Sequence, residues 1–153
     1  MNLQRLIEQH PAAPAVIMPI AFLCLWFFVS ASISVIGGWS SLAKVYRAQV
    51  PFDGTKWSGQ SGQMRWLANY NRVLTMGVNP QGLYLSSMFL FRFMHPPLLV
   101  AWSDIKVRSS QSWGFGHVTL TMGQDLAIPL RIRAKLAARM RESAGSYWPV
   151  EEM

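Results

Sequence analysis

The sequence is poor in charge and almost free of cysteine. Charged residues make up only 14% of its 153 residues, whereas soluble domains usually carry about 25%. The single cysteine, Cys24, excludes an internal disulfide and any metal site built from several cysteines. Acidic residues number 7 against 14 lysines and arginines, which gives a net charge of +7. Such a basic balance is typical of chains that meet nucleic acid, an anionic membrane surface or an acidic protein.

The shortage of charge is concentrated in one segment. No Asp, Glu, Lys or Arg occurs from Pro11 to Ala43. A helix over 14–36 would be about 34 Å long at 1.5 Å per residue, enough to cross a hydrocarbon core of about 30 Å. The competing interpretation is a cleaved signal peptide, because Ser30-Ala31-Ser32 offers small residues to a peptidase. The long leader contains Glu8 and a single basic residue, which favours a retained transmembrane helix.

The charges beside this span predict its orientation. Arg5 is the only basic side chain before it, whereas several lysines and arginines follow it closely. Lysine and arginine gather on the cytoplasmic side of membrane spans. We therefore expect a single-pass protein with the short segment 1–13 outside and the C-terminal part in the cytoplasm.

Beyond the span the hydrophobic period changes from helical to two. Residues 37–61 are expected to be a helix extension and a linker, because 51–63 is rich in glycine and polar residues. In residues 71–79 the apolar side chains alternate, and Asn79-Pro80-Gln81-Gly82 predicts a turn back into a second strand. Later strands are expected within 98–109, 113–122 and 126–134, followed by a helix over 134–144 and a tail over 146–153.

These elements predict an α+β fold that is mainly β. A single N-terminal transmembrane helix would be followed by a small antiparallel sheet or partial barrel, capped by a C-terminal amphipathic helix. Three stretches carry a further likeness: Arg72-Val73-Leu74-Thr75, Gly82-Leu83-Tyr84-Leu85-Ser86, and Leu98 to Ile105 ending in Ala101-Trp102-Ser103-Asp104-Ile105.

In these stretches the chain resembles the pleckstrin-homology and GRAM-like superfamily, in particular its short bacterial members attached to membrane spans. The likeness covers roughly Gly62 to Ser143, which places the domain at 62–145. It implies a binding domain rather than a catalytic one, in the bacterial inner membrane.

One stretch, FRFMHPPLLVAWSDI at 91–105, has the residue types of a reaction centre. His95 and Asp104 would form an acid–base pair, or His95 and His117 would bind a metal. Two prolines follow His95 and remove two backbone donors, so a turn residue bonded to nearby backbone is the favoured interpretation. Asp104 is then expected to end a strand by bonding its own backbone, with Trp102 in the core. We therefore expect a non-enzymatic protein with no catalytic residue, metal or cofactor.

Two functional hypotheses remain. The favoured one is a protein-interaction module that serves as an accessory or assembly subunit of a membrane complex; the alternative is a tethered reader of anionic lipid headgroups. Membrane lipids and a membrane-protein partner or second copy are the expected partners, and nucleic acid is not. The basic residues expected to contact a headgroup or an acidic partner are Lys44, Arg47, Lys56, Arg65, Arg72, Arg131, Arg133, Lys135, Arg139 and Arg141.

The span itself carries two further expectations. Small residues allow two membrane helices to approach closely, and aromatic residues anchor helices at the lipid–water interface. The expected helix-packing face is Ser30, Ala31, Ser34, Gly37 and Gly38, and the expected interface anchors are Trp39 and Tyr46.

Overall fold

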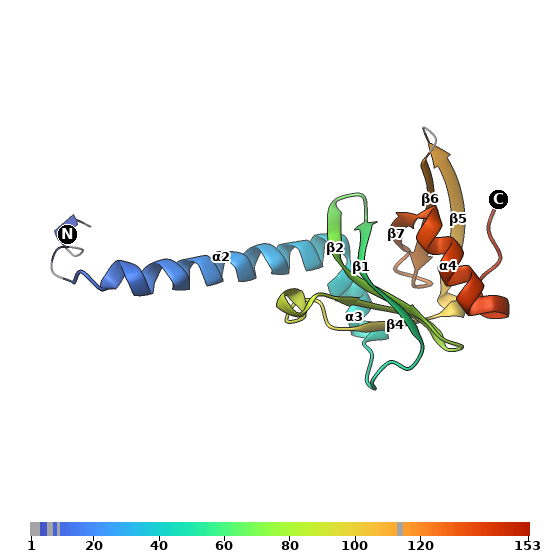
Figure 1. Cartoon of the computed structure of the whole chain (residues 1–153), viewed down its shortest axis with the longest axis horizontal. Helices are drawn as coiled ribbons and strands as arrows, with labels where there is room; N and C mark the ends of the chain where they lie inside the picture. Colours follow the sequence, from blue (N-terminus) through green and yellow to red (C-terminus); the bar gives the residue numbers. More distant parts are fainter. Residues whose placement is uncertain (1–3, 6–7, 9, 113–114) are drawn as a thin grey trace. The chain divides into compact units, whose positions relative to one another are not determined.

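The computed structural model describes residues 4–5, 8, 10–112 and 115–153 (Figure 1). It divides into two compact units, Met1–Ser32 and Ile33–Met153. The elements are α2 (Ala13–Gly37), α3 (Trp39–Tyr46), β1 (Thr55–Met64), β2 (Ala68–Val78), β3 (Gly82–Ser87), η1 (Phe89–Phe91), β4 (Leu98–Ala101), η2 (Trp102–Asp104), β5 (Ile105–Ser112), β6 (Phe115–Met122), β7 (Ile128–Arg133), α4 (Ala134–Ala144) and η3 (Gly145–Tyr147).

Helix α2 is the long apolar helix that the sequence predicts. It has 25 residues, one more at each end than expected, and contains Pro19. At 1.5 Å per residue it is about 37 Å long, so it is long and apolar enough to span a membrane. Its large apolar side chains are exposed from Val16 to Val29 and again at Val35 and Ile36, whereas Ile33 packs partly buried against the core.

The second unit is built on one antiparallel sheet of seven strands in the order β4-β3-β2-β1-β7-β6-β5. The sheet curls into a half-barrel, and Figure 1 shows α4 beside β6 and β7. The predicted α+β fold, mainly β and closed by a C-terminal helix, is therefore confirmed. The alternating apolar residues of the strands fill the inside of the curl, as a period of two requires. The core includes Leu74, Met76, Leu83, Leu85, Leu98, Val100, Val107, Leu120, Met122, Ile128, Leu130, Leu136 and Met140.

Several local predictions are confirmed in detail. Asn79 begins the β2–β3 turn, and its Oδ1 accepts hydrogen bonds from the backbone N–H groups of Gln81 and Gly82, both at 3.0 Å. Trp102 lies in the core and donates its indole N–H to the carbonyl oxygen of Asn79 at 2.8 Å. The apolar stripe of α4 is buried as expected, at Leu136, Ala137, Met140 and Ala144.

The predicted helix extension and linker over 37–61 is wrong in its last seven residues, 55–61. Strand β1 begins at Thr55 and lies at the centre of the sheet, between β2 and β7. The sequence of β1 lacks the alternation of apolar and polar residues that is typical of a strand. Its packing depends instead on glycine, which has no side chain. A Cβ at Gly62 would lie 3.0 Å from Leu130 and 3.2 Å from Leu74. Glycine therefore lets β1 fit between these two core residues, and the two neighbouring strands supply its hydrogen bonds.

The junction between α2 and α3 belongs to the β domain. Gly38 has a left-handed backbone, φ 86°, which turns the chain from one helix into the next. Trp39 follows, is fully buried, and donates its indole N–H to the carbonyl oxygen of Pro96 at 2.9 Å. The prediction that Trp39 anchors the chain at the lipid interface is therefore wrong, because its ring is enclosed by protein.

Part of the expected helix-packing face is also used inside the domain. Ser34 is buried and donates its hydroxyl to the carbonyl oxygen of Met94 at 2.8 Å. A Cβ at Gly37 would lie 2.7 Å from Ala68, and one at Gly38 would lie 2.7 Å from Ile128. These three small residues therefore allow close approach to the domain's own chain rather than to a second membrane helix. For Ser30 and Ala31, helix packing stays a prediction.

Candidate functional site

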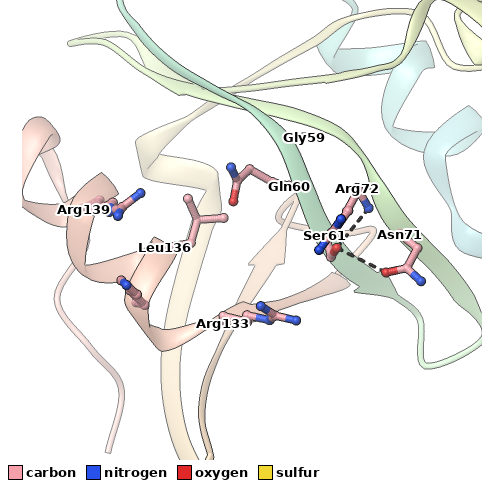
Figure 2. Close-up of a pocket in the computed structure, with 9 residues that line it drawn as sticks. Gly59, Gln60, Ser61, Asn71, Arg72, Arg133, Leu136 and Arg139 are labelled. Carbon is pink, nitrogen blue, oxygen red and sulfur yellow. Dashed lines mark hydrogen bonds between the residues drawn. The ribbon is translucent and has the colours of Figure 1, made fainter.

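Four of the predicted basic residues surround one hollow between the β1–β2 hairpin and α4. We call this hollow the basic cleft; its volume is about 650 Å³. Figure 2 shows Leu136 and Arg139 coming from α4 on one side and Gln60 and Ser61 from β1 on the other. The lining residues are Gly59, Gln60, Ser61, Asn71, Arg72, Arg133, Lys135, Leu136 and Arg139.

The hairpin is distorted where it forms the wall of the cleft. The pairing of β1 with β2 shifts register on both sides of Gln60, and Gly59 and Arg72 have left-handed backbones with φ 66° and 54°. The hydroxyl of Ser61 accepts the backbone N–H of Arg72 at 2.9 Å and donates to Oδ1 of Asn71 at 3.4 Å (Figure 2). Left-handed backbone costs about 1 kcal/mol in a residue other than glycine. Bulges of this kind often re-aim side chains at functional sites.

The cleft is uniformly positive. None of its described lining residues is acidic, and Arg72, Arg133, Lys135 and Arg139 form no ion pair within the described chain. Helix α4 begins directly after Arg133, and no side chain of the described residues caps its N-terminus. Its free backbone N–H groups add a partial positive charge at the same place. An anion entering the cleft would therefore meet charges from three elements that nothing in the described chain neutralises.

The other predicted basic residues lie elsewhere. Lys44 and Arg47 are exposed at the end of α3 and just after it. Lys56 places its ammonium 5.9 Å from the ring of Phe52 and 6.0 Å from that of Tyr84. The remaining three are Arg65 beside Gly38, Arg131 with its guanidinium 5.8 Å from the ring of Trp66, and Arg141 paired with Glu151 at 3.4 Å.

His95, the centre of the FRFMHPPLLVAWSDI question, is buried in an aromatic cluster. Only 1% of the residue is exposed, and its ring packs edge-on against Trp39 and Tyr70 with centroids 5.1 and 5.6 Å away. Its Nδ1 lies 3.3 Å from the carbonyl oxygen of Phe91, and its Nε2 lies 3.1 Å from the hydroxyl of Tyr70. A carbonyl accepts only, so Nδ1 carries the proton and Nε2 accepts from Tyr70. The prediction of a histidine bonded to nearby backbone is confirmed.

Burial sets the protonation states of this cluster. It lowers the pKa of His95 below its ordinary value, and the hydrogen bond to Phe91 opposes part of the shift. Burial also raises the pKa of Tyr70 well above its usual range, so the phenol keeps its proton. Both rings are therefore neutral at pH 7, and the cluster is a structural clamp.

The lowered pKa of His95 predicts a loss of stability in acid. The unfolded chain binds a proton near pH 6.5 and the folded one only at lower pH. Stability from the neutral ring is therefore complete above pH 6.5 and declines as pH falls through that value toward the lowered pKa. Urea unfolding of the full chain in detergent at pH 7.5 and 5.5 measures it. The His95→Gln variant, which has no such titration, should lose less stability across this interval; an equal loss would contradict the assignment.

Asp104 has a different set of partners from those expected. Its Oδ2 accepts the hydroxyl proton of Tyr46 at 2.8 Å, and its Oδ1 accepts from the amide of Gln124 at 2.8 Å. The prediction that it bonds its own backbone is wrong; the carboxylate instead ties the end of α3 to the β6–β7 turn. Burial, followed by the bond to Asp104, raises the pKa of Tyr46. Tyr46 is half-buried against the core, so a role as an interface anchor gains no support from its position.

The structure gives the residues of the hypothetical metal and acid–base sites other partners. Nδ1 of His117 lies 3.3 Å from Arg131, while His95 is enclosed in the aromatic cluster. Among the described residues, no group of three or more His, Cys, Asp or Glu could hold a metal ion.

The sequence did not reveal the neutral wall of the cleft. Gln60 and Ser61 belong to the stretch 51–63 interpreted as a linker, Asn71 begins the predicted strand over 71–79, and the left-handed Arg72 has no sequence signature. The nearest signal was the pair of glycines at 59 and 62 in an otherwise polar run, since glycine inside a strand often marks a bulge.

Comparisons of the chain with protein families, with curated proteins and with solved structures found no match.

Proposed function

We propose that this chain is a membrane-anchored, non-enzymatic interaction module whose basic cleft binds an acidic segment of a membrane-protein partner. It would act as an accessory or assembly subunit in the bacterial inner membrane, held by α2 as a single span with the β domain in the cytoplasm. The observation that carries the proposal is the convergence on one hollow of four cations that, among the residues the structure describes, have no ion-pair partner and no carboxylate beside them in the lining. The half-barrel with its C-terminal helix also supports the resemblance to pleckstrin-homology domains.

The chemistry of the lining favours a peptide. Guanidinium groups bind carboxylates through two parallel hydrogen bonds. The amides of Gln60 and Asn71 can bond a peptide backbone, and Leu136 can contact an apolar side chain. The non-enzymatic character is supported by His95 and Asp104, each of which is committed to structural hydrogen bonds.

A lipid headgroup is the alternative occupant, because guanidinium groups also bind phosphate oxygens in the same way. The cleft is lined by cations over much of its wall, which suits a phosphorylated headgroup as well as a carboxylate-rich segment.

Photo-crosslinking in native membranes tests the choice. A photoreactive amino acid would replace Gln60 inside the cleft or Gln111, an exposed glutamine on β5 outside it. The expected product is a protein adduct from Gln60 but not from Gln111, joined through a segment rich in Asp and Glu. A lipid adduct from Gln60 alone would overturn the protein proposal in favour of the headgroup. Equal adducts from both positions would show that the cleft selects nothing.

A further inference from the structure

Two apolar loops of the β domain are exposed next to the end of α2. The first is 88–94, which contains η1. Phe89 is 81% exposed, Phe93 84% and Leu90 60%, and Arg92 is the only charged residue in this loop. Contiguous apolar surface of this kind is uncommon on a soluble domain and marks a site of contact with protein or membrane.

The second loop is the β1–β2 turn. Trp66 is 61% exposed and Leu67 75%. Arg65 and Trp66 both have left-handed backbones, φ 47° and 63°, which cost about 1 kcal/mol each in residues other than glycine. The turn therefore adopts an unfavourable conformation in which two large apolar side chains face outward rather than into the core.

Both loops are fastened to the last turn of α2 by contacts within the second unit. Met94, at the end of the first loop, accepts the hydroxyl proton of Ser34 at 2.8 Å. Ala68, directly after the second loop, is so close to Gly37 that a Cβ there would lie 2.7 Å away. The bond between Tyr70 and His95, with an oxygen–nitrogen distance of 3.1 Å, ties the two loops to each other.

The position of these contacts along α2 determines the depth of the two loops relative to the membrane. The first exposed apolar side chain of α2 is Val16 and the last is Ile36, with the partly buried Ile33 between them; this length is about 31 Å at 1.5 Å per residue, close to one hydrocarbon thickness of about 30 Å. Ser34 and Gly37 lie at the end of that stretch. The loops attached to them are therefore at the level where hydrocarbon gives way to headgroups.

We propose that loops 88–94 and 65–67 together form a membrane-docking surface that inserts into the lipid interface beside the span. This inference rests on the proposed function in one respect, that α2 crosses the membrane. Phe, Trp, Leu and Met side chains would enter the boundary between headgroups and acyl chains. Arg92 and Arg65 would extend toward lipid phosphates, as long cationic side chains do at this depth.

The bilayer fits this surface better than a protein does, because the loops adjoin the exposed apolar end of the span. Val35 and Ile36 on α2 are 60% and 50% exposed, and the residues on either side of them, Ser34 and Gly37, contact the chain at the ends of the two loops. A span in lipid thus brings the same lipid to both loops, without any further partner.

Fluorescence quenching with the full-length protein in liposomes of phosphatidylcholine and phosphatidylglycerol tests the docking surface. Bimane would be attached in the Phe89→Cys variant with Cys24 replaced by Ser. Phe89 is exposed, so the variant should fold, and circular dichroism checks this. We expect quenching by nitroxide on shallow lipid positions, and a rate of quenching by aqueous iodide about fivefold lower than at an exposed site in water.

The matched control is Phe115→Cys in the same background. Phe115 is 74% exposed and lies at the far end of the sheet from Trp66, since β7 runs from Pro129, beside Arg65, to Arg133, opposite His117. Its label should be quenched by iodide and not by lipid nitroxide. The same pattern at Phe89 would overturn the docking surface, and so would protection from both quenchers, because that would show a covering protein.

The native Cys24 separates this inference from the proposal on which it rests. Labelled in the otherwise unchanged chain, it lies within α2 and should be quenched by nitroxide deep in the acyl chains. Lipid quenching at Cys24 without lipid quenching at Phe89 would support the membrane span and contradict only the docking surface. Iodide quenching at both positions would overturn the span as well.

Discussion

Replacing Trp39 by alanine is expected to lower the free energy of unfolding of the β domain by about 4 kcal/mol. Trp39 is fully buried, packs against Tyr70 and His95, and bonds the carbonyl oxygen of Pro96. Alanine would leave a cavity and a buried carbonyl without its donor, and both costs add. Urea unfolding of the full chain in detergent, followed by near-ultraviolet circular dichroism, measures the change.

Two variants make this prediction specific. Trp39→Phe keeps most of the ring but removes the N–H, so it should cost about 1 to 3 kcal/mol for the unpaired carbonyl of Pro96 and the lost volume. Trp66→Ala removes a tryptophan that is 61% exposed and should cost less than about 1 kcal/mol. Equal effects of Trp39→Ala and Trp66→Ala in detergent would show that Trp39 is not part of the core.

The regular elements of the fold were predictable because they depend on local pattern. Alternation in β2 and β7, the turn at Asn79 and the stripe of α4 each follow from the spacing of apolar residues or from turn chemistry. These signals determine which face of an element is buried, so the predictions made from them needed no correction.

The errors share one physical origin, which is packing between segments far apart in the sequence. Trp39 follows an apolar span and has the pattern of an interface anchor, but its partner Pro96 lies 57 positions later. Strand β1 has the composition of a loop, but β2 and β7 supply its hydrogen bonds. Neither partner is visible from the local sequence, because each is brought into place only when the sheet curls.

The candidate site was predictable in its charge and not in its shape. The basic residues expected to make contacts fall into two parts of the sequence, a first cluster from Lys44 to Arg72 after the span and a second from Arg131 to Arg141 near the C-terminus. The structure separates the first cluster and joins only Arg72 to the second, because β2 and α4 meet across the bulged part of β1. The bulge of β1 and the left-handed backbone of Arg72 change where the side chains of the cleft lie. The spacing of residues in the sequence does not reveal this change.

The cleft and the docking surface lie at different positions along the β1–β2 hairpin, the docking surface at its turn and the cleft in the middle of β1. Along β1 the Trp66 turn follows Met64, and the cleft begins at Ser61 and continues to Gly59. Four residues of strand cover about 13 Å. A lipid-inserted turn would thus place the near edge of the cleft about 13 Å further along the strands, where a segment of a neighbouring protein can reach it. The two proposals are therefore compatible and assign different partners to the two surfaces.

Neutralising two cleft arginines is expected to weaken the binding of an acidic peptide about 100-fold. The variant Arg133→Gln/Arg139→Gln removes one cation at the N-cap of α4 and one from the middle of this helix, and it leaves the strained Arg72 untouched. A hydrogen bond to a charged group contributes about 1.5 to 3 kcal/mol, and a loss of about 3 kcal/mol for the pair corresponds to about 100-fold in Kd. The probe is a fluorescein-labelled hexaglutamate peptide, measured by anisotropy with the full chain in phosphatidylcholine nanodiscs.

The matched control is Lys44→Gln/Arg108→Gln, which removes the same amount of charge from two exposed positions outside the cleft. Screening at physiological salt, with a Debye length of about 8 Å, should limit its effect to about threefold. Equal losses in the two double variants would mean that the peptide responds to net charge alone and would contradict a defined site. A large loss in the cleft variant only would mean that the convergence of β2, β7 and α4 selects the anion. The difference in Kd between the two double variants should become smaller as the salt concentration rises, because salt partly screens charge-assisted contacts in an open hollow.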